Sequence, residues 1–331
     1  MNMTINASRA IEFLKEGKVV AVPAETVYGL AADAMNPTAI SKVFEIKGRP
    51  ADNPLICHFH SIDQIRKYVK DIPAATEMLM QHFSPGPISC MLDLKENSPL
   101  QFATCGSAQV IARIPSHEIF LQILRGFDLP VAAPSANTSG RVSPTSAAMV
   151  ERDLGNKPVG IVDGGTSGIG LESTITDARN SNEIFILRPG AIGEKEIRRI
   201  LPSIKFLYEK NAINSAIPGI KYRHYAPATP VAIAHHFNDL ENEKDAALLL
   251  TLEQIATLSA EQKKKFTAQK TILISLGSIR DADDIARNFY MHLAALDQSG
   301  IQKAYFLKND WGDSSVGKAL QNRIEKIVSN V

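Results

Sequence analysis

The chain has 331 residues, which exceeds the length at which a single hydrophobic core usually keeps growing, so we expect two domains. Hydrophobic residues make up 44% and charged residues 21% of the sequence, a composition typical of a folded globular protein and not of a disordered chain. The formal net charge is only +1, from 36 basic and 35 acidic residues, so bulk charge predicts no attraction to nucleic acid or to a membrane surface.

The N-terminal segment has no apolar stretch typical of a secretory signal, and instead predicts an amphipathic helix around Ala10 to Leu14. No apolar run approaches the roughly 20 residues that a membrane-spanning helix needs. Cys57, Cys90 and Cys105 are too few and too scattered for a disulfide framework or a four-ligand zinc site, so we expect reduced thiols. A cytoplasmic location is therefore the default expectation.

Strands and helices alternate through the first part of the chain, with strands in excess up to about residue 190. We expect strands over 18–23, 54–59, 88–94, 108–114, 131–133, 160–163, 173–177 and 184–188, and helices over 38–46, 61–69 and 74–83. The excess of strands favours a mixed-sheet domain over a regular βαβ repeat.

The pattern changes after residue 208. Residues 209–229 show no period of two or of 3.6 and predict a long connection. We then expect strands over 231–234, 246–250, 271–275 and 304–307, and helices over 281–296 and 314–328. This order predicts a small Rossmann-like α/β domain, although the glycine motif of dinucleotide-binding proteins is absent. We therefore expect domains at 1–208 and 230–331, joined by a linker at 209–229.

The stretch E-I-K-G-R-P-A-D-N-P-L at 45–55 places two cations beside two prolines. Because proline cannot continue a helix, this stretch is expected to leave the helix over 38–46 and to form an extended or turning loop. We expect Lys47 and Arg49 to lie in the open in this loop. An isolated pair of this kind is usually a solvated basic turn, so its meaning depends on the neighbouring loops.

Loops rich in small and polar residues recur at the ends of the predicted strands. They are P-A-E-T-V-Y-G-L at 23–30, K-G-R-P-A-D-N-P-L at 47–55, A-R-I-P-S-H at 112–117, A-A-P-S-A-N-T-S-G at 132–140, G-L-E-S-T-I at 170–175 and L-R-P-G-A-I at 187–192. Loops of this kind build concave sites on a sheet.

These loops supply directed donors suited to oxyanions. The cations are Lys47, Arg49, Arg113 and Arg188, the hydroxyls are Thr26, Ser135, Ser143, Ser173 and Thr174, and the amides are Asn53 and Asn137. Such a set matches phosphates and a carboxylate. The motifs of α/β-hydrolases, zinc proteases and Walker A ATPases are absent, so an ATP site would need a different phosphate cradle.

The combination of K-G-R at 47–49 with S-A-N at 135–137, framed by the other loops, resembles the YrdC-type domain of L-threonylcarbamoyl-AMP synthases. The segment P-G-I-K-Y-R-H-Y-A-P at 218–227, followed by a small α/β domain, resembles the longer, two-domain branch of that family. The resemblance covers nearly the whole chain. It implies an α/β fold in which a twisted, mixed β-sheet surrounds a large cavity, followed by the linker and the Rossmann-like domain.

The resemblance also implies a reaction. L-threonine, bicarbonate and ATP would give L-threonylcarbamoyl-AMP and pyrophosphate with Mg2+, for threonylcarbamoyladenosine modification of tRNAs that read ANN codons. The product would pass to the tRNA threonylcarbamoyl-transfer machinery. Neither membrane binding nor strong direct nucleic-acid binding is expected.

Site roles follow from the resemblance position by position. Catalytic roles fall on Lys47, Arg49, Ser135 and Asn137; nucleotide contacts on Arg49, Asn53, Gln109, Ser135, Ser143, Arg188, Tyr222 and Tyr225; and threonine contacts on Thr26, His58, Arg113, Ala133 and Ser173. Arg113 is the expected partner of the threonine carboxylate. The linker, with K-Y-R-H-Y at 221–225, is expected to cross the mouth of the cavity, and the resemblance names no metal ligands.

Two positions and the strand S-C-M-L-D at 89–93, where the family more commonly has a threonine-rich strand, depart from the family pattern, and two alternatives stay open. Ser84 stands where the family usually has tryptophan, and Gln109 where threonine is common, which affects the expected packing of adenine. One alternative is an RNA-binding module whose cationic cavity grips a backbone without chemistry, which a net charge of +1 disfavours. The other is a carbamoyltransferase that uses carbamoyl phosphate.

Overall fold

A computed structural model describes residues 3–207 and 225–329, which divide into two compact units. The N-terminal unit comprises Met1–Ser139 and Ser143–Tyr222, and the C-terminal unit comprises Gly140–Val142 and Arg223–Val331. Most of the predicted linker at 209–229 lies outside the described residues, so the predicted boundaries at 208 and 230 stay predictions.

The N-terminal unit contains a mixed β-sheet. Its strands are β1 (Met3–Thr4), β2 (Val20–Val22), β3 (Gly29–Asp33), β4 (Cys57–His58), β5 (Ile88–Asp93), β6 (Gln109–Arg113), β7 (Val131–Ala132), β8 (Gly160–Ile161), β9 (Thr174–Asp177), β10 (Glu183–Arg188) and β11 (Lys205–Leu207). Among the described residues they are ordered β1-β8-β2-β3-β7-β4-β6-β5-β9-β10-β11. Parallel and antiparallel pairs alternate irregularly along this order, so the mixed sheet that the excess of strands predicts is confirmed.

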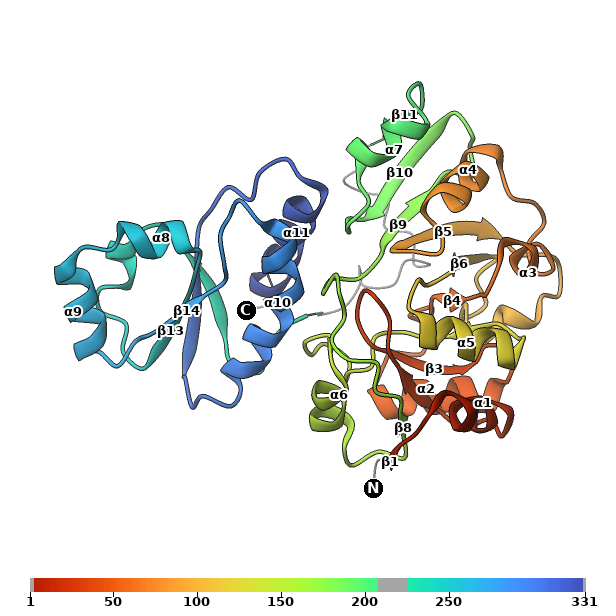
Figure 1. The fold of residues 1–331 in the computed structure, drawn as a ribbon, viewed down its shortest axis with the longest axis horizontal. Helices are drawn as coiled ribbons and strands as arrows, with labels where there is room; N and C mark the ends of the chain where they lie inside the picture. The colour runs from red at the N-terminus through yellow and green to blue at the C-terminus, as the bar shows by residue number, and fades with distance from the viewer. Residues whose placement is uncertain (1–2, 208–224, 330–331) are drawn as a thin grey trace. The chain divides into compact units, whose positions relative to one another are not determined.

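Helices cover the sheet of this unit (Figure 1). They are α1 (Ala7–Lys15), α2 (Pro37–Lys47), α3 (Ile62–Arg66), α4 (Ala74–Phe83), α5 (Glu118–Phe127), α6 (Ala147–Leu154) and α7 (Glu194–Ile200), with a 3-10 turn at Pro99–Gln101. The bounds of α2 follow from its sequence. The Asn36 side chain caps the first turn, Pro37 supplies a preset φ, and Gly48 ends the helix in the left-handed region at φ 58.

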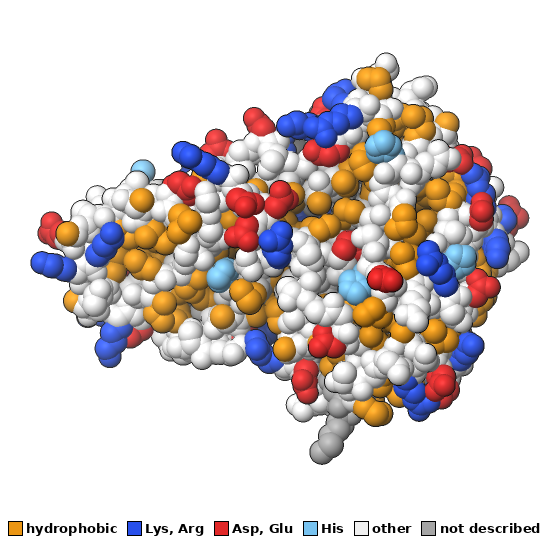
Figure 2. Space-filling model, viewed as in Figure 1, with side chains coloured by type: hydrophobic (Ala, Val, Ile, Leu, Met, Phe, Trp, Pro, Cys, Tyr) orange, Lys and Arg blue, Asp and Glu red, His pale blue; other side chains and the backbone are white. Residues whose placement is uncertain are grey.

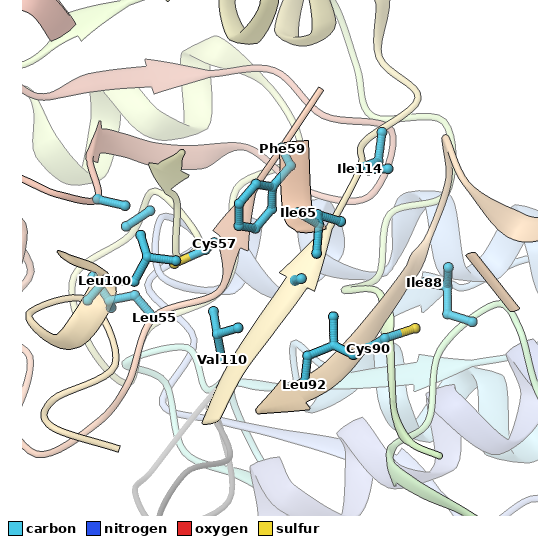
Figure 3. Packing of buried hydrophobic residues seen from close by; sticks show 14 of the residues in the cluster. Leu55, Cys57, Phe59, Ile65, Ile88, Cys90, Leu92, Leu100, Val110 and Ile114 are labelled. Carbon is cyan, nitrogen blue, oxygen red and sulfur yellow. The ribbon is translucent and has the colours of Figure 1, made fainter. Parts of the chain in front are cut away.

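The main core of the N-terminal unit lies on one face of the sheet. Cys57, Ala112 and Cys90 are register partners on β4, β6 and β5, and all three belong to one buried cluster. Figure 3 shows labelled members of this cluster, among them Phe59 and Val110, gathered over these strands. Because side chains alternate along a strand, the residues next in sequence to these core positions face the opposite side.

The C-terminal unit is a three-layer α/β domain with a parallel sheet of order β12-β15-β13-β14 among the described residues. Its elements are β12 (Val231–Ala234), β13 (Ala246–Leu250), α8 (Leu252–Thr257), α9 (Ala260–Ala268), β14 (Ile272–Ser275), α10 (Ala282–Leu296), β15 (Lys303–Leu307) and α11 (Ser315–Val328), with a 3-10 turn at Phe237–Leu240. Helices α8 and α9 cover one face and α10 and α11 the other (Figure 1). The predicted small α/β domain is confirmed.

Two expectations from the sequence are wrong in ways that affect the site. The segment at 23–30 is predicted as a loop, but its last two residues, Gly29 and Leu30, begin β3. Lys47 was expected in an open loop, but it is the last residue of α2 and is 1% exposed. The three cysteines are free, with Cys57 and Cys90 buried, as expected. None of the helices in the described parts of the chain is long and apolar enough to cross a bilayer.

The Phe59 side chain is fully buried in the main core and packs beside Tyr68 at a ring-centroid distance of 6.0 Å. Replacing Phe59 with Ala should lower the free energy of unfolding of the N-terminal unit by about 3 to 5 kcal/mol, because a large cavity remains. Denaturant titration followed by far-UV circular dichroism measures this loss. Phe102→Ala is the matched control, since Phe102 is 43% exposed; equal shifts for both variants would contradict the described core.

Candidate active site

A buried lysine joins two distant segments of the N-terminal unit. The Lys47 ammonium donates hydrogen bonds to the backbone carbonyls of Ser135 and Asn137, and the Lys47 carbonyl accepts one from the Ser139 amide at 2.7 Å. The predicted K-G-R and S-A-N segments are therefore in direct contact. Burial, with a smaller contribution from the Arg49 charge, lowers the pKa of Lys47 well below its usual value, while the Asp153 charge opposes this.

The second cation of this segment, Arg49, organises the loop that follows α2. Its Nε donates to the Asn53 carbonyl at 3.0 Å, and its Nη2 donates to the Asn53 side-chain oxygen at 2.7 Å and to the Pro54 carbonyl at 2.9 Å. Asn53 is buried, and its side-chain nitrogen has no hydrogen-bond partner among the described residues. The buried side-chain nitrogen of Asn53 can therefore still donate a hydrogen bond close to the Arg49 guanidinium.

The loop at 132–140 is held against the start of β3 by backbone hydrogen bonds. The Leu30 amide donates to the Pro134 carbonyl at 2.7 Å, and the Ala136 amide donates to the Tyr28 carbonyl at 2.8 Å. Gly29 lies between these bonds, where an added Cβ would come within 3.2 Å of the Ala133 Cβ. The absence of a side chain at Gly29 therefore allows the segment that contains Thr26 to approach the S-A-N loop closely.

A row of polar side chains crosses the sheet on the face opposite the main core. His58, Arg113 and Ser89 are register partners on β4, β6 and β5, and the row continues through Ile175 on β9 to Arg188 on β10. With strands about 4.8 Å apart, four strand intervals span about 19 Å, which is room for an amino acid beside a phosphate chain. The sequence reasoning named three of these residues but did not find Ser89.

One end of this row is a hydrogen-bonded group around Ser173. Arg188 donates from Nε to the Ser173 carbonyl at 3.0 Å and from Nη2 to the Ser173 hydroxyl at 3.1 Å. The Ser173 and Ser89 hydroxyls lie 2.7 Å apart. In the same region of the chain, the Ser143 hydroxyl donates to Glu172 Oε1 at 2.6 Å. Ser173 and Arg188, predicted for different substrates, are therefore in direct contact.

The other end of the row contains His58 and Arg113. Arg113 Nη2 donates to Glu25 Oε1 at 2.6 Å, Arg113 Nε donates to the Gly86 carbonyl at 3.3 Å, and both ionic side chains are largely buried. Burial and then the Arg113 charge hold the pKa of His58 well below its usual value, so His58 is neutral at neutral pH. Thr26 Oγ1 and His58 Nδ1 are buried with no hydrogen-bond partner among the described residues.

One predicted site residue, Gln109, is not brought into this group, and the two linker tyrosines stay predictions. Gln109 begins β6, where it bonds to Asp93 and Ser107, about 13 Å along the strand from Arg113. Tyr225 belongs to the C-terminal unit, where it is buried, with its ring stacked near Tyr290. Tyr222 lies outside the described residues, as does most of the predicted lid.

The sequence reasoning missed Glu25. Its motif P-A-E-T-V-Y-G-L supplied only the neighbouring Thr26 to the predicted site. The signal that could have found it is the run P-A-E-T at 23–26, in which a charged side chain stands between residues expected to be buried. A buried carboxylate requires a buried cation, and Arg113 is that cation.

Together these observations describe a two-unit α/β protein whose N-terminal unit contains a buried set of cationic and hydroxyl side chains. Residues 12–190 match the Sua5/YciO/YrdC family model, described as "Telomere recombination", and residues 192–327 match the model described as "Threonylcarbamoyl-AMP synthase, C-terminal domain". The chain belongs to this Sua5/YciO/YrdC family, in its two-domain form.

Similar proteins cover the chain almost from end to end. Threonylcarbamoyl-AMP synthase of Pyrococcus abyssi is 38% identical over 348 residues, covering 98% of this chain and 97% of that protein. The Bacillus subtilis enzyme of the same name is 36% identical over 326 residues, covering 96% and 92%. The crystal structure of P. abyssi Sua5 complexed with L-threonine has a TM-score of 0.84 at 34% identity, covering 99% and 97%.

Replacing Lys47 with Met should loosen the loop at 134–139, because two buried carbonyls lose their donor while the volume stays similar. We expect a loss of unfolding free energy on the order of 3 kcal/mol and faster amide hydrogen exchange in that loop. Ser135→Ala is the control, since it removes the hydroxyl but keeps the backbone carbonyl that Lys47 binds. Unchanged exchange in Lys47→Met would show that the lysine does not hold the loop.

Proposed function

We propose that the chain is an L-threonylcarbamoyladenylate synthase, a nucleotidyltransferase that forms L-threonylcarbamoyl-AMP and pyrophosphate from L-threonine, bicarbonate and ATP. The observation that carries the proposal is the buried polar row that runs from His58 and Arg113 to Arg188, together with the loop that Lys47 holds. Full-length similarity to proteins named threonylcarbamoyl-AMP synthase supports the same reaction.

Threonine is assigned to the Arg113 end of the row. A guanidinium presents a planar fork that suits a carboxylate, and Arg113 Nη1 has no hydrogen-bond partner in the described contacts. His58 is neutral, and with Thr26 it offers buried polar atoms for the amino acid's own polar groups. Ala133 completes the proposed threonine site together with Ser173, whose hydroxyl contacts Ser89, the register partner of Arg113. The related P. abyssi structure is complexed with L-threonine, which supports threonine as a ligand of this chain.

ATP is assigned to the Arg188 end of the row and to the loops around Lys47. The proposed nucleotide contacts are Arg49, Asn53, Ser135, Asn137, Ser143 and Arg188. Arg49 and Arg188 are the proposed phosphate partners, because charge-assisted bonds to phosphate are strong and directed. A triphosphate placed near Lys47 would raise the pKa of its ammonium and favour the charged form. Gln109 and the two linker tyrosines, Tyr222 and Tyr225, stay predictions.

Mg2+ is expected to arrive with the nucleotide. No group of three or more His, Cys, Asp or Glu side chains suited to a metal occurs in residues 3–207 and 225–329. The described side chains therefore do not build a metal cage of their own. Mg2+ commonly binds through substrate phosphates and water, and it would then need few protein ligands.

The chemistry explains why the site concentrates cations in a buried place. The carbamate of threonine must approach the α-phosphorus of ATP, so two anions come together while pyrophosphate leaves. Fixed guanidinium and ammonium groups lower this repulsion and stabilise the charge that develops on pyrophosphate. Exclusion of water strengthens these interactions and protects the labile carbamate. We propose that the product then passes to cytoplasmic machinery that modifies the tRNAs reading ANN codons.

The RNA-binding alternative finds little support in the surface. Acidic and basic side chains are interspersed over the visible face of each unit (Figure 2), and the net charge is +1. Non-specific binding to RNA needs many phosphate contacts on a basic surface. The cations assigned here are buried or half-buried, which suits a small ligand better than a polynucleotide.

Pyrophosphate release tests the proposal directly. The full chain with ATP should release pyrophosphate only when threonine and bicarbonate are both present, because the acceptor of the adenylyl group is their carbamate. A coupled pyrophosphate assay with each component omitted in turn measures this. Release that does not depend on threonine, or that occurs with carbamoyl phosphate in place of threonine and bicarbonate, would rule the synthase out.

Arg113→Lys should raise the KM for threonine by about 10-fold to 100-fold, because lysine keeps the charge but loses the planar fork, at a cost of about 1.5 to 3 kcal/mol. The KM for ATP should change little. Initial-rate kinetics with each substrate varied separates the two effects. The control is Arg125→Lys, at an exposed position on α5. An increase confined to the KM for ATP would contradict the assignment of Arg113 to threonine.

A further inference from the structure

Glu25 contacts the proposed threonine site but has no role in the function described so far. Its Oε1 accepts a hydrogen bond from Arg113 Nη2 at 2.6 Å, and its side chain is only 13% exposed. The Ile169 amide donates to the Glu25 backbone carbonyl at 2.8 Å, which holds the segment in place. The carboxylate is therefore fixed beside the guanidinium that is proposed to bind the threonine carboxylate.

The second oxygen of the Glu25 carboxylate can accept a hydrogen bond, but none of the described contacts supplies one. Glu25 Oε2 is buried and has no hydrogen-bond partner within residues 3–207 and 225–329, and the same holds for Thr26 Oγ1 and His58 Nδ1. Thr26 is next in sequence, and His58 is the register partner of Arg113. Buried polar atoms in native proteins are nearly always paired, so three unpaired atoms around one ion pair indicate a place that a polar ligand completes.

The Arg113–Glu25 ion pair carries one positive and one negative charge, which complement the two charges of an α-amino acid. The threonine zwitterion carries a carboxylate and an ammonium on one carbon, and Arg113 and Glu25 present the opposite charges side by side. Arg113 Nη1 is available to the carboxylate and Glu25 Oε2 to the ammonium. Without an acidic partner, an ammonium next to Arg113 would meet another cation in a buried site, which is unfavourable.

We propose that Glu25 is a catalytic residue that binds the ammonium of threonine and takes its proton before carbamate formation. This inference rests on the proposed synthase function and adds a residue to its first step. The threonine ammonium gives one proton to Glu25 Oε2, which frees the nitrogen lone pair. The amine then attacks the carbon of bicarbonate, so that a C–N bond forms and a C–O bond breaks. The departing hydroxide takes a second proton from the nitrogen and leaves as water, and the carbamate keeps the single negative charge.

Comparing the rates of the forward and reverse reactions distinguishes this catalytic role from a structural one. Formation of product from threonine, bicarbonate and ATP needs a deprotonated amine, whereas the reverse reaction of purified L-threonylcarbamoyl-AMP with pyrophosphate gives ATP and a carbamate without that step. Glu25→Gln should lower kcat for pyrophosphate release by about 100-fold or more and should change the rate of ATP formation little. Glu118→Gln, at an exposed site at the start of α5, should change neither rate.

A second measurement needs no variant. (3R)-3-hydroxybutanoate is threonine without its amine, and calorimetric titration of the full chain compares the two. We expect threonine to bind about 10-fold to 100-fold more tightly, the value of one charge-assisted bond of about 1.5 to 3 kcal/mol.

The outcomes distinguish this inference from the function on which it rests. Equal affinities for the two ligands, an unchanged forward rate in Glu25→Gln, or equal losses in both directions would overturn the role of Glu25 while leaving the synthase in place. Failure of the unaltered chain to release pyrophosphate would instead overturn the proposed function.

Discussion

The contact between the Lys47 ammonium and the carbonyls of Ser135 and Asn137 is the interaction on which the site depends. It connects the end of α2 to a loop about 90 positions further along the chain. A lysine is rarely buried without partners, because removing an ammonium from water costs several kcal/mol. Two carbonyls offset part of that cost here. The result is that the loop takes one shape, and the neighbouring strand β3 is held against the same loop.

The sheet supplies the second constraint. Side chains alternate between the faces of a strand, so the apolar residues Cys57, Ala112 and Cys90 direct their polar neighbours His58, Arg113 and Ser89 to the other face. The packing of the core on one face of the sheet therefore also fixes the positions of the polar side chains on the other face. Because the row is buried, each ion must be balanced nearby. The Arg113–Glu25 pair and the Ser143–Glu172 bond show that the site contains acidic as well as basic groups.

Elements with strong patterns could be predicted from the sequence, and those that depend on distant partners could not. Strands at Val231–Ala234 and Ala246–Leu250 have the expected bounds, because continuous apolar runs predict buried parallel strands. Strand β3 was missed because its sequence G-L-A-A-D lacks the branched and aromatic residues typical of strands, and one of its two partners, β7, lies far away in sequence. The burial of Lys47 depends on carbonyls in another loop, so no local pattern could show it. For Glu25 the run P-A-E-T shows an isolated charge, but the cation that pairs with it is 88 positions away, so the ion pair itself could not be predicted.

The central claim is that these separate segments form one pocket that holds a triphosphate next to an amino acid. A crystal structure of the full chain with threonine and a non-hydrolysable ATP analogue tests it most directly. The account predicts the threonine carboxylate within about 3 Å of the Arg113 guanidinium and phosphate oxygens within the same distance of Arg49 or Arg188. Well-defined ligands bound away from all three guanidinium groups would contradict it.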